Sequence, residues 1–206
     1  MATLTNDFAT ERADEPALVD ATGETTWRQF DERVNRLVNG LRAAGLSTGD
    51  TIAVVVGNRR EWFEIAMACA HGGWTYVPVN WHWVADELAY VFDDADVVAV
   101  LVDGRYADAV GTALADGRSK AVRLVVGIDA PPTGETDDRT FVNYETLLAG
   151  ASTDEPAEPR LGGPMFYTSG TTGRPKGVEL SLRSCLWVVA ACWAPIMGLG
   201  PDDTVL

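Results

Sequence analysis

The sequence predicts an α/β fold, a mainly parallel sheet flanked by helices. Two observations predict it. Short apolar, β-branched segments alternate along the chain with segments whose apolar residues recur at helical period. In addition, TIAVVV at residues 51–56 is typical of a strand buried on both faces, as strands of parallel sheets are. Such alternation indicates βαβ units with helices on both sides of the sheet. The chain has 206 residues, of which 47% are hydrophobic, enough for the core of one domain or slightly more.

The N-terminal elements are expected in a definite order. Residues 1–16 are interpreted as a tail, and residues 17–26 as a hairpin that turns at Thr22-Gly23. A helix follows, because Thr26 and Gln29 have capping-box spacing. The helix ends at Gly45, and its apolar side chains share one face at Trp27, Phe30, Val34, Leu37, Val38 and Leu41.

Beyond residue 56 the expected elements alternate regularly. They are a helix at 60–71, a strand at 75–79, a helix at 84–94, a strand at 97–102, a helix at 105–115 and a strand at 122–127. Exposed loops are expected at 130–138 and 154–164, because both are rich in Pro, Gly and acidic residues. Neither loop is long enough to separate independent domains.

Charge and cysteine usage limit the class of protein. With 16 Lys+Arg against 30 Asp+Glu the net charge is −14, which argues against nucleic acid or an anionic membrane surface as a partner. Cys69, Cys185 and Cys192 form no C-x-x-C pair and are expected to be buried, reduced thiols, as in a cytoplasmic protein. The first residues contain no apolar run typical of a secretory signal. The uncharged stretch 184–201 is interrupted by Pro and Gly, which favours a buried helix over a membrane span.

The segment from Tyr167 to Val178 bears most directly on function. It reads YTSGTTGRPKGV, between a short apolar strand at 164–167 and an extended piece at 178–180. Glycine permits positive φ and close approach of a ligand to the backbone, hydroxyls and amides are neutral donors, and lysine is a cation. This combination suits a polyphosphate. An ordinary surface turn is the alternative that composition alone leaves open.

Local charge favours the polyphosphate hypothesis. Between residues 160 and 183 there are four basic residues and one acid, Glu179, so this stretch carries +3 in an acidic chain. Neither the P-loop pattern G-x-x-x-x-G-K-[ST] nor a G-x-G-x-x-G turn occurs. Glu179 is interpreted as a solvated acid, and His71 and His82 as structural residues without a second ligand at metal-binding spacing.

The order of residues in this segment resembles the phosphate loop of the adenylate-forming superfamily. This superfamily contains acyl-CoA synthetases, adenylation domains of peptide synthetases and luciferases. GLSTGDTIAVVVGN and DELAYVFDDADV are similar to other regions of the family, less specifically, so the resemblance covers residue 17 to the end. It implies the first subdomain of the family's large N-terminal domain. Leu182 departs from the family pattern, which usually has a histidine there.

The resemblance also implies an activity and a set of ATP contacts. The activity is that of a ligase of fatty acid metabolism: ATP activates a carboxylic acid, fatty or related, as its adenylate, and the acyl group passes to CoA. Arg174 is not included among the contacts, since the family varies there. The residues expected to contact the ATP phosphates are Thr168, Ser169, Gly170, Thr171, Thr172, Gly173 and Lys176.

The family's other functional motifs are expected downstream of this chain. These are the adenine-binding segment, the ligands of Mg²⁺ and the lysine of the C-terminal domain. Residues 17–206 are therefore interpreted as a partial AMP-binding domain, a fragment without catalytic residues or metal ligands of its own. Two alternatives stay open: a truncated, catalytically silent product acting as a binding module, and an adenylation domain for another acid.

Overall fold

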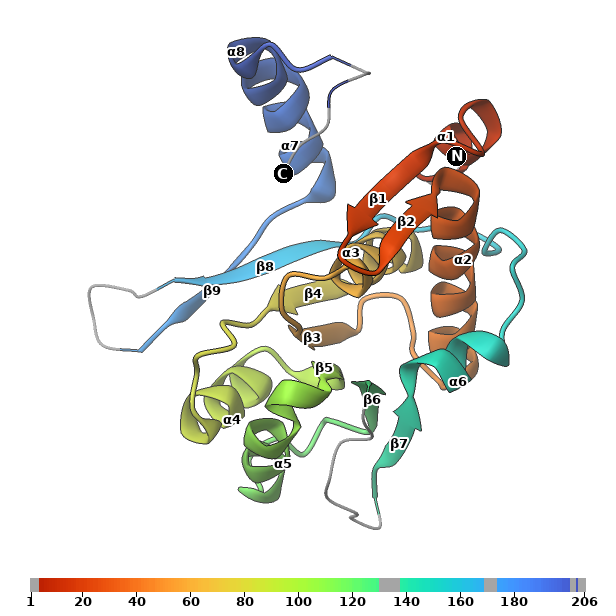
Figure 1. Ribbon diagram of the computed structural model, residues 1–206. Helices are drawn as coiled ribbons and strands as arrows, with labels where there is room; N and C mark the ends of the chain where they lie inside the picture. The colour runs from red at the N-terminus through yellow and green to blue at the C-terminus, as the bar shows by residue number, and fades with distance from the viewer. Residues whose placement is uncertain (1–3, 130–137, 169–173, 201–202, 204–206) are drawn as a thin grey trace.

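The computed structural model describes residues 4–129, 138–168, 174–200 and 203 (Figure 1). Seven strands form one sheet in the order β7-β6-β5-β3-β4-β8-β9. All neighbouring strands run parallel except β8 and β9, which are antiparallel. Strands β1 and β2 form a separate two-stranded sheet. The predicted α/β class with a mainly parallel sheet is confirmed.

The element bounds are as follows. The helices are α1 (Asn6–Glu11), α2 (Trp27–Ala43), α3 (Arg60–Gly72), α4 (Ala85–Asp94), α5 (Ala107–Ala115), α6 (Tyr144–Ala149), α7 (Leu182–Val188) and α8 (Ala194–Met197), with a 3₁₀ turn at Gly104–Tyr106 and a π-helical turn at Val189–Trp193. The strands are β1 (Pro16–Asp20), β2 (Gly23–Thr26), β3 (Thr51–Val55), β4 (Thr75–Pro78), β5 (Val97–Asp103), β6 (Leu124–Ile128), β7 (Thr140–Asn143), β8 (Gly163–Thr168) and β9 (Lys176–Glu179).

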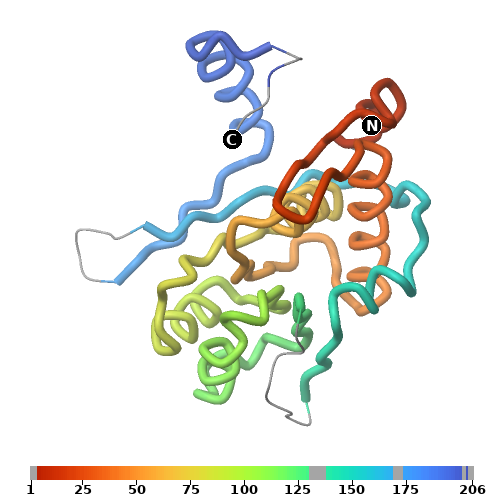
Figure 2. The backbone as a smooth tube through the Cα atoms, in the orientation of Figure 1, coloured from red at the N-terminus to blue at the C-terminus, as the bar shows by residue number. Residues whose placement is uncertain are grey.

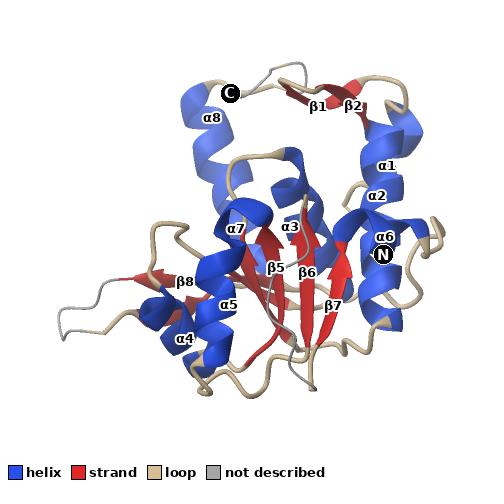
Figure 3. Ribbon diagram, turned by 60° about the horizontal axis from the view of Figure 1, so that its bottom comes forward, coloured by secondary structure: helices blue, strands red, loops and turns tan. Residues whose placement is uncertain are grey.

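Helices cover both faces of the central strands (Figure 3). Helices α2, α3 and α6 contribute to one apolar cluster, and α4 and α5 to the other. Strand β3 shows the division, because successive side chains of a strand point to opposite faces. Ile52 and Val54 belong to the first cluster, and Ala53 and Val55 to the second. The apolar run at 51–56 is thus buried on both faces, as predicted.

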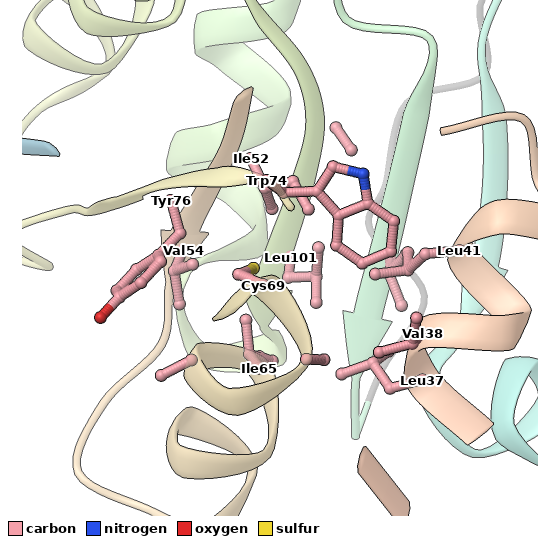
Figure 4. Packing of buried hydrophobic residues seen from close by; sticks show 14 of the residues in the cluster. Leu37, Val38, Leu41, Ile52, Val54, Ile65, Cys69, Trp74, Tyr76 and Leu101 are labelled. Atoms are coloured by element: carbon pink, nitrogen blue, oxygen red, sulfur yellow. The ribbon is translucent and has the colours of Figure 1, made fainter. Parts of the chain in front are cut away.

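The first cluster surrounds the fully buried Trp74 (Figure 4). Its indole Nε1 donates a hydrogen bond to the carbonyl of Ser47 at 3.0 Å, so its polar atom is satisfied inside the core. Cys69 lies in the same cluster, and burial raises the pKa of its thiol. Cys185 and Cys192 are only half-buried, so the expectation of buried thiols holds for Cys69 alone.

Most predicted elements between residues 17 and 128 are present. The capping box of α2 is formed, since Thr26 Oγ1 accepts from the Gln29 amide at 3.3 Å and Gln29 Oε1 accepts from the Thr26 amide at 2.9 Å. Sequence analysis missed α1, β7 and α6. Each has only four to six residues, too few for a hydrophobic period to show. The loop expected at 154–164 ends where β8 begins at Gly163.

The N-terminal segment, interpreted from sequence as a tail, is docked on the domain where it is described. Figure 2 shows it beside α2. The Leu4 amide donates to His71 Nε2 at 2.9 Å, and Thr5 Oγ1 donates to the buried Asp31 carboxylate at 2.5 Å. Phe8 stacks on Trp27 with ring centroids 4.6 Å apart. The polar contacts and the stacked rings together hold residues 4–8 against the domain.

The C-terminal helices differ from the expectation. The sequence favoured a buried helix at 184–201, and this was wrong. Trp187, Trp193 and Ile196 are 65%, 60% and 82% exposed. Helices α7 and α8 stand apart from the main sheet in Figure 1. An apolar composition predicts that a helix is buried against another element, but it does not identify that element. Within the described residues, no helix is long and apolar enough to cross a membrane.

A buried acid connects three helices on one side of the sheet. The Glu64 side chain is 0% exposed and accepts from Arg33 Nε at 2.7 Å and from the Tyr144 hydroxyl at 2.8 Å. Arg33 also reaches Glu145 at 2.7 Å. Burying a carboxylate without partners costs free energy, because the charge loses its hydration. The contacts with Arg33 and Tyr144 offset this cost, so Glu64 can be buried. They tie α2, α3 and α6 together.

Replacing Arg33 therefore tests this network. Arg33→Ala leaves the Glu64 carboxylate buried with Tyr144 as its remaining partner, and we expect a loss of about 3 kcal/mol in the free energy of unfolding. Arg28→Ala, on the same helix but paired with the exposed Asp14, should cost less than about 1 kcal/mol. Urea unfolding followed by circular dichroism measures both. Equal losses in the two variants would contradict the assignment.

Because His71 is buried beside the N-terminal segment, we expect the stability of the protein to depend on pH. Burial lowers the pKa of His71 to about 4, while a nearby Glu155 opposes this shift. Below about pH 6.5, His71 is therefore protonated in the unfolded chain but stays neutral in the folded protein. The contribution of neutral His71 to the free energy of unfolding is complete above that pH and is lost as the pH falls towards 4.

We expect the free energy of unfolding to fall by about 2–3 kcal/mol between pH 7 and pH 4.5 because of His71. His71→Gln keeps an acceptor for the Leu4 amide but does not titrate, so its stability should fall less steeply over this range. His82→Gln, at an exposed position, is the control. Urea unfolding at both pH values gives the slopes, and identical slopes for wild type and His71→Gln would refute the prediction.

Candidate phosphate-binding hairpin

The segment singled out by sequence joins β8 to β9 at the edge of the main sheet. The two strands pair in register from Met165 opposite Glu179 to Thr168 opposite Lys176. Figure 1 shows the hairpin projecting beyond the edge of the main sheet. Thr168 and Lys176, two of the predicted ATP contacts, are both exposed and face each other across the base of the loop. The other five, Ser169, Gly170, Thr171, Thr172 and Gly173, lie outside the described residues.

The start of β8 is fixed by close backbone packing. Gly162 and Gly163 donate to the carbonyls of Ala70 and Trp74 at 2.9 and 3.2 Å. A Cβ on Gly162 would lie 2.2 Å from the Trp74 carbonyl oxygen, and one on Gly163 would lie 2.4 Å from the Leu180 carbonyl oxygen. No side chain fits at either position. Strand β8 pairs with β4 through its first two residues only, Gly163 opposite Thr75 and Pro164 opposite Tyr76.

Gly177 has a different role from the one predicted. The sequence suggested that glycines of this segment provide positive φ and space for a ligand. Gly177 does not have a positive φ. A Cβ there would lie 2.8 Å from Met165 Sδ and 3.2 Å from the Tyr167 ring. A side chain at 177 would therefore displace the Met165 and Tyr167 side chains of the opposite strand.

Helix α4 contacts both strands of the hairpin. The Tyr167 hydroxyl donates to Asp94 Oδ2 at 2.6 Å, and the Tyr90 hydroxyl donates to the Pro175 carbonyl at 3.0 Å. The Tyr90 hydroxyl also lies 3.3 Å from Asp94 Oδ1. The Arg174 guanidinium lies over the Tyr90 ring, 5.0 Å from its centroid. Sequence analysis placed Tyr90 and Asp94 in a helix but gave them no role, because no local pattern links residues about 80 positions apart.

Burial and the Asp94 carboxylate raise the pKa of the Tyr167 hydroxyl, and the same two causes raise the pKa of Tyr90. Both phenols are consequently protonated donors at neutral pH. Arg174 and Lys176 are both exposed cations of the hairpin. The Arg174 guanidinium lies over the Tyr90 ring, whereas Lys176 lies opposite Thr168 at the base of the loop.

Further residues around the hairpin have partners within the domain. Trp83 lies edge-on to Tyr167 with centroids 6.5 Å apart, and Trp81 stacks on Tyr106. Ser181 caps α7, its Oγ accepting from the Ser184 amide at 3.1 Å. Glu179 is exposed and accepts from Thr75 Oγ1 at 3.4 Å. The described part of the chain contains no group of three or more His, Cys, Asp or Glu that could hold a metal ion.

Comparison with known proteins gives consistent matches over nearly the whole chain. The sequence model of the family described as "AMP-binding enzyme" matches residues 6–206. The chain is 33% identical over 174 residues to 3-oxocholest-4-en-26-oate–CoA ligase of Rhodococcus rhodochrous, covering 84% of this chain and 30% of that protein. It is 32% identical to indoleacetate–CoA ligase of Aromatoleum aromaticum, covering 89% of this chain and 35% of the relative. The chain thus spans about a third of the length of these relatives.

Solved structures share the fold. The inhibitor-bound N-terminal domain of FACL13 from Mycobacterium tuberculosis superimposes with a TM-score of 0.79 at 26% identity, covering 93% of this chain and 46% of that one. A benzoate CoA ligase from Burkholderia xenovorans LB400 gives a TM-score of 0.80 at 20% identity, covering 97% and 38%. The second likeness concerns the fold alone.

The tight packing at Gly177 gives a prediction. Gly177→Ala places a methyl group against Met165 and Tyr167, and we expect it to lower the free energy of opening the hairpin by about 1–2 kcal/mol. Gly150→Ala is the control, since its Cβ would have 3.7 Å to the nearest atom. Native-state hydrogen exchange of the β8 and β9 amides measures the effect. Unchanged exchange in Gly177→Ala would contradict the packing described.

Proposed function

The chain belongs to the AMP-binding enzyme family, and on this premise we propose that it is the polyphosphate-binding part of an ATP-dependent carboxylic acid–CoA ligase. In the proposed reaction a substrate carboxylate attacks the α-phosphate of ATP, giving an acyl-adenylate and pyrophosphate. The thiol of CoA then attacks the acyl carbon, forming a thioester and releasing AMP. Such transfers depend on positioning and charge stabilisation more than on a protein nucleophile.

One observation carries the assignment of the phosphate site. Thr168 and Lys176 are directly opposite in an antiparallel pair, so their side chains lie on the same face of the hairpin. Both are exposed. A hydroxyl donor and an ammonium group are thereby held side by side at the base of the glycine- and threonine-rich loop, an arrangement that suits the oxygens of a polyphosphate.

The role of each residue in this proposal follows from its chemistry. Lys176 would pair with the β- and γ-phosphate charges, and Thr168 would donate to a phosphate oxygen. We extend the proposal to Ser169, Gly170, Thr171, Thr172 and Gly173 on the strength of the sequence motif. Mg²⁺ would supply further neutralisation of the phosphate charge, and the described residues do not form a site for it.

The class of acid is part of the proposal. The names of the relatives specify a steroid acid, indoleacetate, ferulate and medium- or long-chain fatty acids. These acids share a hydrophobic body, so we propose a fatty or related hydrophobic acid as the substrate. A cytoplasmic location is also proposed; it is supported by cysteines that form no disulfide.

The two lysines of the chain give a matched test. Lys176→Ala removes the cation at the loop, and we expect a loss of about tenfold or more in ATP affinity, since hydrogen bonds to charged groups contribute about 1.5–3 kcal/mol. Lys120→Ala removes the same charge from an exposed position elsewhere and should leave the affinity unchanged. Isothermal titration calorimetry of the 206-residue chain measures both. Equal affinities in the two variants would refute the site.

For the ligase activity itself, the assay is carboxylate-dependent exchange of pyrophosphate into ATP on any longer reading frame that contains this segment. Lys176→Ala should lower the exchange rate, and Lys120→Ala should not. Exchange that persists unchanged in Lys176→Ala would remove the loop from the proposed reaction.

A further inference from the structure

The outer half of the hairpin has little support from the sheet. Strand β8 is hydrogen-bonded to β4 only through its first two residues, Gly163 and Pro164. Residues 165–168 continue past β4 and pair on one side with β9 alone. An isolated two-stranded ribbon is marginally stable in water. Another element must therefore hold Thr168 and Lys176 in a fixed position relative to the domain.

Helix α4 is placed to do this. Tyr90 and Asp94 are four residues apart and so lie on the same face of the helix, one turn from each other. Asp94 accepts from Tyr167, the residue directly before Thr168. Tyr90 donates to the carbonyl of Pro175, the residue directly before Lys176. The helix thus contacts β8 at Tyr167 and the residue that precedes β9, Pro175, each immediately next to a proposed phosphate ligand.

The helix that makes these contacts is itself rigidly held. Its opposite face is buried in the second apolar cluster through Leu88, Ala89, Val91 and Phe92. A side chain mounted on a packed helix keeps its position better than one on a free loop. Tyr90 and Asp94 can consequently hold the hairpin in a fixed position relative to the core.

The chemistry of the contacts favours a defined geometry. Asp94 is a charged acceptor for the Tyr167 hydroxyl, and hydrogen bonds to charged groups are stronger than neutral ones. The Arg174 guanidinium over the Tyr90 ring adds a cation–π contact on the β9 side. Both strands of the hairpin are therefore attached, each by a different residue of α4.

We propose that Tyr90 and Asp94 are positioning residues for the phosphate site, holding Tyr167 and Pro175 so that Thr168 and Lys176 stay side by side at the base of the loop. This inference rests on the proposed function for its consequence in ATP binding. The attachment of the hairpin to α4 is independent of any nucleotide.

The test uses two conservative variants with matched controls. Asp94→Asn removes the charge that Tyr167 contacts, and Tyr90→Phe removes the hydroxyl but keeps the ring under Arg174. Asp93→Asn makes the same charge change at the neighbouring exposed position of α4, and Tyr106→Phe makes the same change of side chain in the turn before α5. Hydrogen exchange of the 206-residue chain without nucleotide is measured first, and ATP affinity by calorimetry second.

We expect exchange in peptides covering residues 163–179 to become about fivefold faster in Asp94→Asn and in Tyr90→Phe. Peptides from β3 and α3 should exchange as in the wild type, which separates local release of the hairpin from general destabilisation. ATP affinity should fall about fivefold in the same two variants. The Asp93→Asn and Tyr106→Phe chains should match the wild type in both measurements.

Other outcomes separate the two claims. Unchanged hairpin exchange in Asp94→Asn and Tyr90→Phe would overturn the positioning role, as would an equal increase in Asp93→Asn. Faster hairpin exchange with undiminished ATP affinity would overturn it too, because the hairpin would then bind phosphate without this support. If the wild-type chain binds no ATP while the variants show faster exchange, the proposed function fails and the attachment of the hairpin to α4 stands.

Discussion

The position of the hairpin depends on the close approach of β8 to the turn between α3 and β4. Gly162 donates to the carbonyl of Ala70 near the end of α3, and Gly163 donates to the carbonyl of Trp74 in the turn. A Cβ on Gly162 would collide with the Trp74 carbonyl, and one on Gly163 would collide with the Leu180 carbonyl. This contact brings β8 into the parallel sheet beside β4 and directs the rest of the strand past the sheet's edge. The proposed position of Thr168 and Lys176 depends on this geometry, because β8 carries Thr168 past the edge of the sheet and pairs it with Lys176.

The molecule combines a firmly packed sheet with a site at its edge. Strands β3, β5 and β6 are covered on both faces by apolar clusters, and the Arg33–Glu64–Tyr144 contacts join the helices on one face. The hairpin, by contrast, has mostly exposed side chains; Met165 and Tyr167 pack against the second apolar cluster, and α4 adds hydrogen bonds to it. Binding residues carried on loops and held by a rigid scaffold are common, since the loop must meet a ligand while its base stays fixed.

Charge is arranged to suit an anionic ligand within an acidic protein. The chain carries −14 overall, yet Asp94, an acid that contacts the hairpin, accepts a hydrogen bond from the Tyr167 hydroxyl. Arg174 is held over the Tyr90 ring. Lys176 is left exposed on the same face as Thr168. The local environment of the loop therefore differs from the acidic average that composition suggests.

The sequence by itself determined the α/β class, the capping box of α2 and the doubly buried strand at 51–56, because these depend on residues close together in the chain. The motif at residues 167–178 is equally local, and it is the basis on which a phosphate loop is proposed there. The sequence did not reveal α1, β7 or α6, which are too short to show a period, and it predicted burial for the exposed helices α7 and α8. Only the tertiary structure decided why Gly177 is glycine and which helix supports the loop. Tyr90 meets Pro175, and Asp94 meets Tyr167, across more than 70 residues of sequence. Such contacts depend on the topology of the sheet, which local sequence patterns do not predict.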